Sequence, residues 1–159
     1  MSATVDTIKK RYLDWQAIAA LVDNLAKELP RDFDALLVIT RGGMVPGGLL
    51  SETLDIHNVL VAAVQFYTGI GETLDQPIFF QFPADPILYG KRILVIDDIW
   101  DSGRTAVAVK ERIHDAGGIP IVAVLQYKPR RSRYPGHRPD YYAEETDDWI
   151  VYPWETDEE

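Results

Sequence analysis

The sequence contains no cysteine, which excludes disulfide bonds, thiol catalysis and metal sites built from cysteine ligands. It also lacks any apolar run close to the ~20 residues that a membrane-spanning helix needs, and the N-terminal Met1–Lys10 has no apolar signal core. Lysine and arginine number 16 against 25 aspartates and glutamates, a net charge of -9, which argues against binding of nucleic acid through a basic surface. We therefore expect a cytoplasmic protein that does not bind membranes.

Hydrophobic residues make up 47% of the 159 residues, which suits one compact domain spanning 1–159. Strand-like and helix-like patterns alternate along the chain. We expect strands at 35–40, 58–66, 78–82 and 119–127 and another from Ile93, helices at 15–28, 44–54 and 104–116, and a mobile loop at 68–76. This alternation predicts an α/β fold with a mostly parallel, twisted sheet and helices on both of its faces.

The first expected helix has the clearest pattern of the three. Asp14 is predicted to cap it, and Pro30 to end it. Its expected buried face comprises Trp15, Ile18, Ala19, Val22, Leu25, Ala26 and Leu29.

The most informative segment is the strand from Ile93 and the turn that follows it. Asp97 and Asp98 end the apolar run, and Asp101 precedes a turn of small residues, Ser102–Gly103, before the expected helix. Ligands of open α/β sheets bind at the carboxyl ends of strands, where the N–H groups of a following helix attract anions. Capping acids of a solvated turn are the alternative explanation, but they account for one acid and not three. The pattern therefore suits a ligand with phosphate, hydroxyl groups and a divalent cation.

Two further segments could belong to the same site. The turn Arg41–Gly42–Gly43 follows the strand at 35–40, and its N–H groups could bind an anion, although a tight connection is the simpler explanation of two glycines alone. Lys128 to Arg138, called the basic loop below, is followed by an aromatic segment from Trp149 to Trp154. Taken singly, Trp149 would be a core aromatic residue and Lys128 a surface lysine.

Taken together, these segments resemble the type I phosphoribosyltransferase family. The segment Arg92–Thr105 is similar to the family's phosphoribosyl-pyrophosphate (PRPP) motif, and Arg41–Gly43 is similar to its pyrophosphate loop. Lys128 and Trp149–Ile150 are similar to the base-binding part of xanthine–guanine phosphoribosyltransferases. The segments occur in the chain order of the family, so the resemblance covers nearly the whole sequence.

The resemblance implies transfer of the 5-phosphoribosyl group of PRPP to a 6-oxopurine (guanine, xanthine or hypoxanthine) in purine salvage, with release of diphosphate and with Mg²⁺ as cofactor. The implied PRPP-binding residues are Asp97, Asp98, Asp101, Ser102, Gly103, Arg104 and Thr105. Asp98 is also the implied metal ligand, and Asp101 the catalytic residue that accepts the purine proton. Arg41, Gly42 and Gly43 are implied to bind diphosphate, and Lys128, Trp149 and Ile150 to bind the base.

The resemblance also implies features beyond these roles. A non-proline cis peptide is implied between Thr40 and Arg41, and residues 128–154 form the implied base-binding hood, followed by an acidic, solvated tail at 155–159. A homo-oligomer, dimer or tetramer, is expected. The basic loop leaves two other interpretations open, because its arginines could make subunit contacts or could bind RNA or a nucleotide in a non-catalytic, regulatory protein of the same fold.

Overall fold

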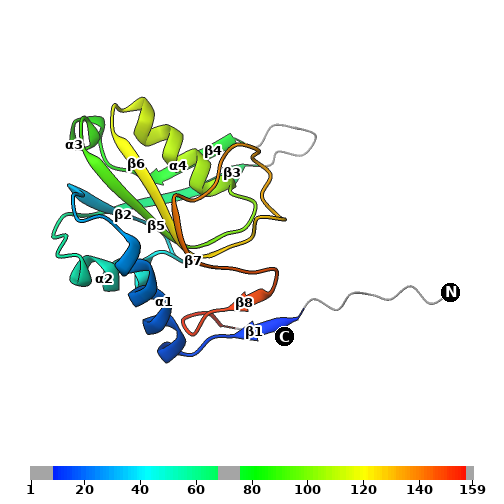
Figure 1. The fold of residues 1–159 in the computed structure, drawn as a ribbon. Coiled ribbons are helices and arrows are strands. Elements are labelled where there is room, and N and C mark those ends of the chain that lie inside the picture. The colour runs from blue at the N-terminus through cyan, green and yellow to red at the C-terminus, as the bar shows by residue number, and fades with distance from the viewer. Residues whose placement is uncertain (1–8, 68–75, 157–159) are drawn as a thin grey trace.

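A six-stranded sheet forms the centre of the computed structural model, which describes residues 9–67 and 76–156 (Figure 1). The strand order is β4-β3-β2-β5-β6-β7. The bounds are β2 (Ala35–Ile39), β3 (Val59–Tyr67), β4 (Gln76–Gln81), β5 (Arg92–Trp100), β6 (Ile119–Tyr127) and β7 (Tyr141–Glu145). All neighbouring strands are parallel except β3 and β4, which pair antiparallel. The predicted mostly parallel α/β fold is therefore confirmed.

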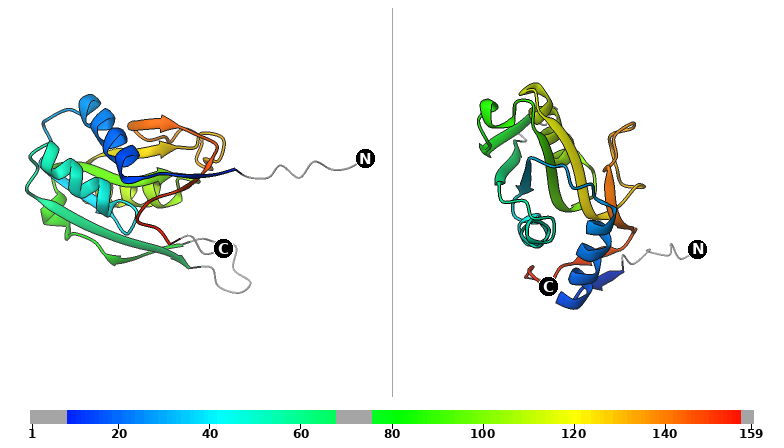
Figure 2. Two further views of the ribbon diagram at one scale, coloured as in Figure 1. Left: turned by 90° about the horizontal axis from the view of Figure 1, so that it is seen from below. Right: turned by 60° about the vertical axis from the view of Figure 1, so that its left-hand side comes forward.

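Helices cover both faces of this sheet (Figure 1 and Figure 2). On one face, α1 (Trp15–Glu28) and α2 (Met44–Thr53) pack against Leu36 and Val38 of β2. On the other face, α3 (Asp85–Leu88) and α4 (Arg104–Asp115) pack against Leu37 of the same strand. Side chains of a strand alternate between its two faces, so a strand covered on both must be apolar throughout, as β2 is.

Helix α1 begins as its sequence predicts. Asp14 caps it, with its Oδ1 accepting a hydrogen bond of 2.8 Å from the backbone N–H of Ala17. The buried residues are Ile18, Leu21, Val22, Leu25 and Ala26. The expectation that Trp15 and Ala19 share this face is wrong, because both are exposed, and the Trp15 ring lies near that of Trp154.

A separate two-stranded sheet lies at the end of the molecule away from α3 and α4 (Figure 1). It pairs β1 (Lys10–Tyr12) in parallel with β8 (Trp149–Val151), so that Lys10 is opposite Trp149. Both strands have three residues, too few for a periodic pattern to reveal them in the sequence. Their pairing joins the N-terminal segment to the aromatic segment of the expected base-binding hood.

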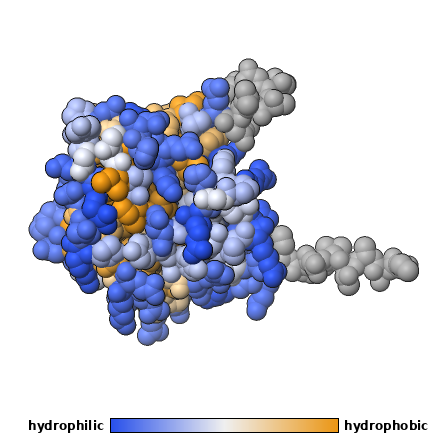
Figure 3. Space-filling model, turned by 45° about the horizontal axis from the view of Figure 1, so that its top comes forward, coloured by the Kyte–Doolittle hydropathy of each residue, from blue (hydrophilic) through white to orange (hydrophobic). Residues whose placement is uncertain are grey.

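The surface is mostly hydrophilic on the face shown in Figure 3, where hydrophobic residues gather in limited patches. No helix in the described ranges 9–67 and 76–156 is long and apolar enough to cross a membrane. Nearly all of the expected mobile loop (68–76) and most of the expected acidic tail (155–159) lie outside the described residues.

Candidate active site

The carboxyl ends of β2 and β5 lie side by side. The two glycine-containing turns can form one site only if this is so. These strands are parallel neighbours, with Val38 opposite Ile96, so the turns that follow them leave the same edge of the sheet. A Cβ atom added to Gly42 would lie 2.3 Å from Oδ2 of Asp98. Only glycine therefore allows the turn after β2 to approach the acid pair, Asp97 and Asp98, this closely.

The turn after β5 opens directly into a helix. Gly103, at the N-cap position of α4, has φ 87°, and a Cβ there would lie 2.4 Å from Nε1 of Trp100. The backbone N–H of Arg104 donates to Oγ of Ser102 over 3.2 Å. Arg104 and Thr105 then form the first turn of α4, where the positive end of the helix dipole favours an anion. The predicted phosphate-binding residues thus occupy one helix N-terminus.

The two adjacent acids lie inside β5 rather than after it. Asp98 is buried, and burial raises its pKa from an ordinary value of 3.8 to about 6. Burial and the neighbouring charge of Asp98 raise the pKa of Asp97 as well. The backbone N–H of Asp98 donates to Oδ1 of Asp97 over 2.8 Å. Two desolvated carboxyl groups side by side favour a cation or hydroxyl groups as their ligand.

The turn after β2 borders an open cavity of about 860 Å³ on the side of Asp98. Arg41 and Gly42 line it, and Gly43 is buried behind them, with its N–H donating to the carbonyl oxygen of Ile39 over 2.8 Å. The peptide bond between Thr40 and Arg41 is cis, which confirms that prediction. Arg41 is exposed, so its guanidinium is accessible to an anion in this cavity.

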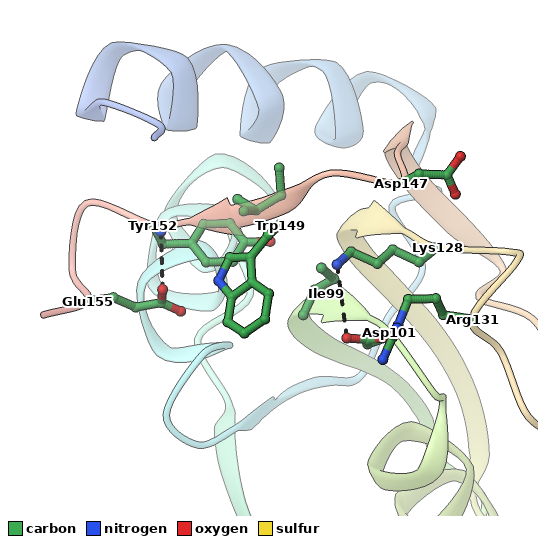
Figure 4. A pocket seen from close by; sticks show the side chains of 9 residues that line it. Ile99, Asp101, Lys128, Arg131, Asp147, Trp149, Tyr152 and Glu155 are labelled. Carbon is green, nitrogen blue, oxygen red and sulfur yellow. Dashed lines mark hydrogen bonds and ion pairs between the residues drawn. The ribbon is translucent and has the colours of Figure 1, made fainter. Parts of the chain in front are cut away.

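The predicted base-binding residues line a second cavity, of about 270 Å³ (Figure 4). Lys128 follows β6 and is buried to 7% exposure, with its Nζ 4.0 Å from Oδ2 of Asp101. The Trp149 ring is 52% exposed at the cavity, and the Ile150 side chain is buried beside it. The predicted base-binding residues and the predicted catalytic Asp101 therefore line the same cavity, called the base cavity below.

Comparison with known proteins identifies the family. The family model described as the phosphoribosyl transferase domain matches residues 9–159 of the sequence. The chain belongs to the phosphoribosyltransferase family. A xanthine-guanine phosphoribosyltransferase of Desulfotalea psychrophila is 32% identical over 96% of this chain and 91% of its own. The family assignment makes the chain an enzyme that transfers phosphoribosyl groups.

Solved structures agree with this assignment. A purine phosphoribosyltransferase from Pyrococcus horikoshii superposes with a TM-score of 0.81 at 34% identity, over 94% of this chain and 96% of that one. A protein of Neisseria gonorrhoeae, determined with bound ppGpp, also superposes with a TM-score of 0.81, at 25% identity, over 94% and 91% of the two chains.

Tyr152 of this phosphoribosyltransferase lines the second cavity and was not predicted from the sequence. Its hydroxyl donates to Oε1 of Gln126 over 2.5 Å and lies 3.2 Å from the carbonyl oxygen of Asp98. The Tyr152 ring stacks on Trp154, with 4.7 Å between ring centroids. Burial raises the pKa of the phenol, which is therefore a neutral hydrogen-bond donor. Its only sequence signal was its place in the aromatic segment, which could equally be core.

Glu155 is a second residue of the site that the sequence did not reveal. It was expected in a solvated tail, but it lines both cavities, and its carboxylate accepts a hydrogen bond of 3.3 Å from the backbone N–H of Tyr152. Its charge also contributes to the raised pKa of Asp98. The composition of an acidic segment at a chain end is the same whether its side chains are solvated or face a cavity, so the sequence does not distinguish the two cases.

Proposed function

We propose that this phosphoribosyltransferase transfers the 5-phosphoribosyl group of PRPP to a ring nitrogen of a 6-oxopurine, namely guanine, xanthine or hypoxanthine, and releases diphosphate. The observation that carries the proposal is the grouping of Lys128, Asp101 and Trp149 around one cavity beside the acid pair. Purine specificity of the relatives named above agrees with it.

The base cavity supplies three kinds of contact. Trp149 can stack on the purine ring, an interaction worth ~1–3 kcal/mol per base. The Lys128 ammonium is a donor only, so it favours a base with an oxo group over one with an amino group at the facing position. The backbone around Ile150 offers further polar groups to the ring edge. These contacts select a 6-oxopurine and fix its plane.

The chemistry needs a cationic sugar and an anionic leaving group to be stabilised together. As the bond from the base nitrogen to the sugar forms and the bond to diphosphate breaks, the carboxylates of Asp97 and Asp98 favour the oxocarbenium-like sugar and hold its hydroxyls. Ser102, Gly103, Arg104 and Thr105 bind the 5′-phosphate at the N-terminus of α4. Arg41, Gly42 and Gly43 bind the diphosphate. Asp101 accepts the proton that the purine nitrogen loses.

The acid pair also fits the expected cation. Mg²⁺ commonly uses one or two carboxylates and completes its coordination with substrate phosphates and water. Residues 9–67 and 76–156 contain no cluster of three or more metal-ligand side chains, but Asp98 lines the cavity beside Arg41 and Gly42, and Asp97 is its neighbour in β5. When bound, Mg²⁺ would neutralise charge on the diphosphate, and Asp98 would be its protein ligand.

A homo-oligomer and a cytoplasmic location belong to the same proposal. Val61 of β3 and Ile78 and Phe80 of β4 are large apolar side chains left exposed near an edge of the sheet, which supports self-association. Sedimentation equilibrium of the purified chain tests the proposed homo-oligomer, and a monomer at all concentrations would contradict self-association.

The test of the function is a panel of free bases incubated with PRPP and Mg²⁺, with diphosphate release as the readout. We expect turnover with guanine, xanthine or hypoxanthine and little with adenine. Asp101→Asn should lower kcat by about 100-fold or more, because a positioned general base contributes 10²–10⁴-fold, while PRPP binding stays nearly unchanged. No release with any base, or retention of RNA at low salt that is lost at higher salt, would favour the non-catalytic alternative.

A further inference from the structure

The basic loop is tied to the turn that carries Asp101. The backbone N–H of Lys128 donates to the carbonyl oxygen of Trp100 over 2.9 Å, and the backbone N–H of Arg133 donates to the carbonyl oxygen of Ser102 over the same distance. The indole N–H of Trp100 adds a bond of 3.1 Å to Oγ of Ser132. These bonds span the start and the middle of the loop, so its backbone is held against residues 100–102, on either side of Asp101.

This attachment brings Arg131 to Asp101 at the base cavity (Figure 4). The Arg131 Nε–H donates to Oδ1 of Asp101 over 2.7 Å. Lys128 approaches the other oxygen, with its Nζ 4.0 Å from Oδ2. Arg131 thus holds one oxygen of the carboxylate by a hydrogen bond, and the Lys128 ammonium lies near the other. The pKa of Arg131 is raised by this hydrogen bond, so its guanidinium stays charged.

We propose that Arg131 is a positioning residue, whose guanidinium holds Oδ1 of Asp101 so that Oδ2 stays beside Lys128 and faces the base. The last torsion of an aspartate is broad, and this side chain is 44% exposed, so an unheld carboxylate would rotate freely. With Oδ1 held, an acceptor and the Lys128 donor stand together in the cavity. That pair matches a ring N–H next to an oxo group.

The inference rests on the proposed function and agrees with the position of three of the five cationic side chains of the basic loop at the base cavity. Of its five cationic side chains, Arg131 contacts Asp101, Lys128 lies beside the same carboxylate, and Arg130 lies 3.3 Å from Asp147. Asp101 and Asp147 both line the base cavity. These arginines are therefore engaged within their own chain, at the site, which favours a role in base binding over contacts with RNA or with another subunit.

A double-mutant cycle tests the proposal. Arg131→Gln, Asp101→Asn and the double variant are compared with the parent in single-turnover assays, so that the slow Asp101→Asn reaction remains measurable. We expect Arg131→Gln to lower kcat/KM for the base about tenfold, because misplacing a reacting group by a fraction of an ångström is costly, and to leave KM for PRPP unchanged. In the Asp101→Asn background the same change should have no further effect, because it acts through Asp101.

The control is Arg138→Gln, the same change at the other end of the basic loop, which should behave as the parent does. The thermal midpoint of Arg131→Gln should also match the parent, since its side chain is 61% exposed and exposed ion pairs contribute little to stability. Unchanged kcat/KM in Arg131→Gln, or an effect that simply adds to that of Asp101→Asn, would overturn the role of Arg131 alone. A parent inactive with every base would overturn the proposed function as well.

Discussion

The two halves of the proposed site differ in what they are made of. The backbone forms the phosphate side, because the turns after β2 and β5 each lead into the N-terminus of a helix. Gly42 and Gly103 lie in these turns at positions where the Cβ of any other residue would clash with a neighbouring side chain. Side chains build the base side: Lys128 and Arg131 come from the basic loop and Trp149 from β8, and two of the three are more than half exposed.

This difference follows from the ligands. A phosphate group is the same in every substrate, and backbone N–H groups bind it without regard to the rest of the molecule. A base must be distinguished from similar bases, which needs side chains whose donors and acceptors match one ring. Changes on the phosphate side should therefore affect all substrates, and changes on the base side should affect them selectively.

The largest expected effect is on the phosphate side, from Gly42→Ala. The added Cβ would lie 2.3 Å from the Asp98 carboxylate, so the turn or the acid must move. We expect kcat/KM to fall by about 100-fold or more with every base, since small displacements at a reacting centre have effects of that size. Steady-state kinetics with PRPP measures it.

Gly48→Ala is the matched control for this change, because a Cβ there meets nothing within 4 Å. Alanine is the better helix former by ~1 kcal/mol, so this variant should be as active as the parent and slightly more stable. Equal activity of the two alanine variants would contradict the close approach of Gly42 to Asp98.

On the base side, Trp149→Ala should raise KM for the purine about 5- to 150-fold, the equivalent of ~1–3 kcal/mol of stacking. KM for PRPP should stay within about twofold, because by this comparison the stack contributes only to base binding. Trp149→Phe retains an aromatic face and should recover most of the loss. A parallel rise of both KM values would remove the distinction between the two sides.

The buried acid predicts a pH-dependent stability. The folded pKa of Asp98 lies above its unfolded value, so its contribution to stability is fully present below about pH 4 and is lost as pH rises through about 6. Asp98→Asn should therefore stabilise the free protein at pH 7.5 by ~3 kcal/mol, from a shift of about two pKa units, and should not stabilise it near pH 4.

Chemical denaturation at both pH values measures this difference, with the exposed Asp23→Asn on α1 as control. Mg²⁺ with diphosphate should narrow the gap at pH 7.5 by stabilising the parent more than Asp98→Asn. An Asp98→Asn variant less stable than the parent at pH 7.5 would show that the carboxylate is satisfied within the fold.

The smallest expected effect concerns the join between the two sides. Tyr152→Phe keeps the stack on Trp154 but leaves Oε1 of Gln126 without its donor. Loss of a buried hydrogen bond typically costs ~1–3 kcal/mol of unfolding free energy, and we expect only a few-fold change in kcat. Tyr89→Phe, at an exposed tyrosine, is the control in the same denaturation assay.

Prediction from the sequence succeeded where the pattern was local and long enough. The expected helices and the longer strands are present within a few residues, because each carries its own period and punctuation, such as Asp14 before α1 and Gly117 after α4. Strands β1 and β8 escaped prediction because each has only three residues, and β7 because its sequence, YYAEE, contains no apolar run. The two glycine-containing turns could be located because the residues of each are contiguous, and their role in phosphate binding stays a prediction.

The sequence by itself therefore determined the α/β class, the family and the two glycine-containing turns, since these depend on residues close together in the chain. Tertiary structure decided the rest: that Gly42 lies against Asp98, that Arg131 donates a hydrogen bond to Asp101, that Tyr152 lines the base cavity, and that Glu155 lines both cavities. Gly42 and Asp98 are 56 residues apart in the sequence, Arg131 and Asp101 are 30 residues apart, and Tyr152 and its partner Gln126 are 26 residues apart. A local sequence pattern does not show which distant segments come into contact, because the order of the strands in the sheet is set by the packing of the core.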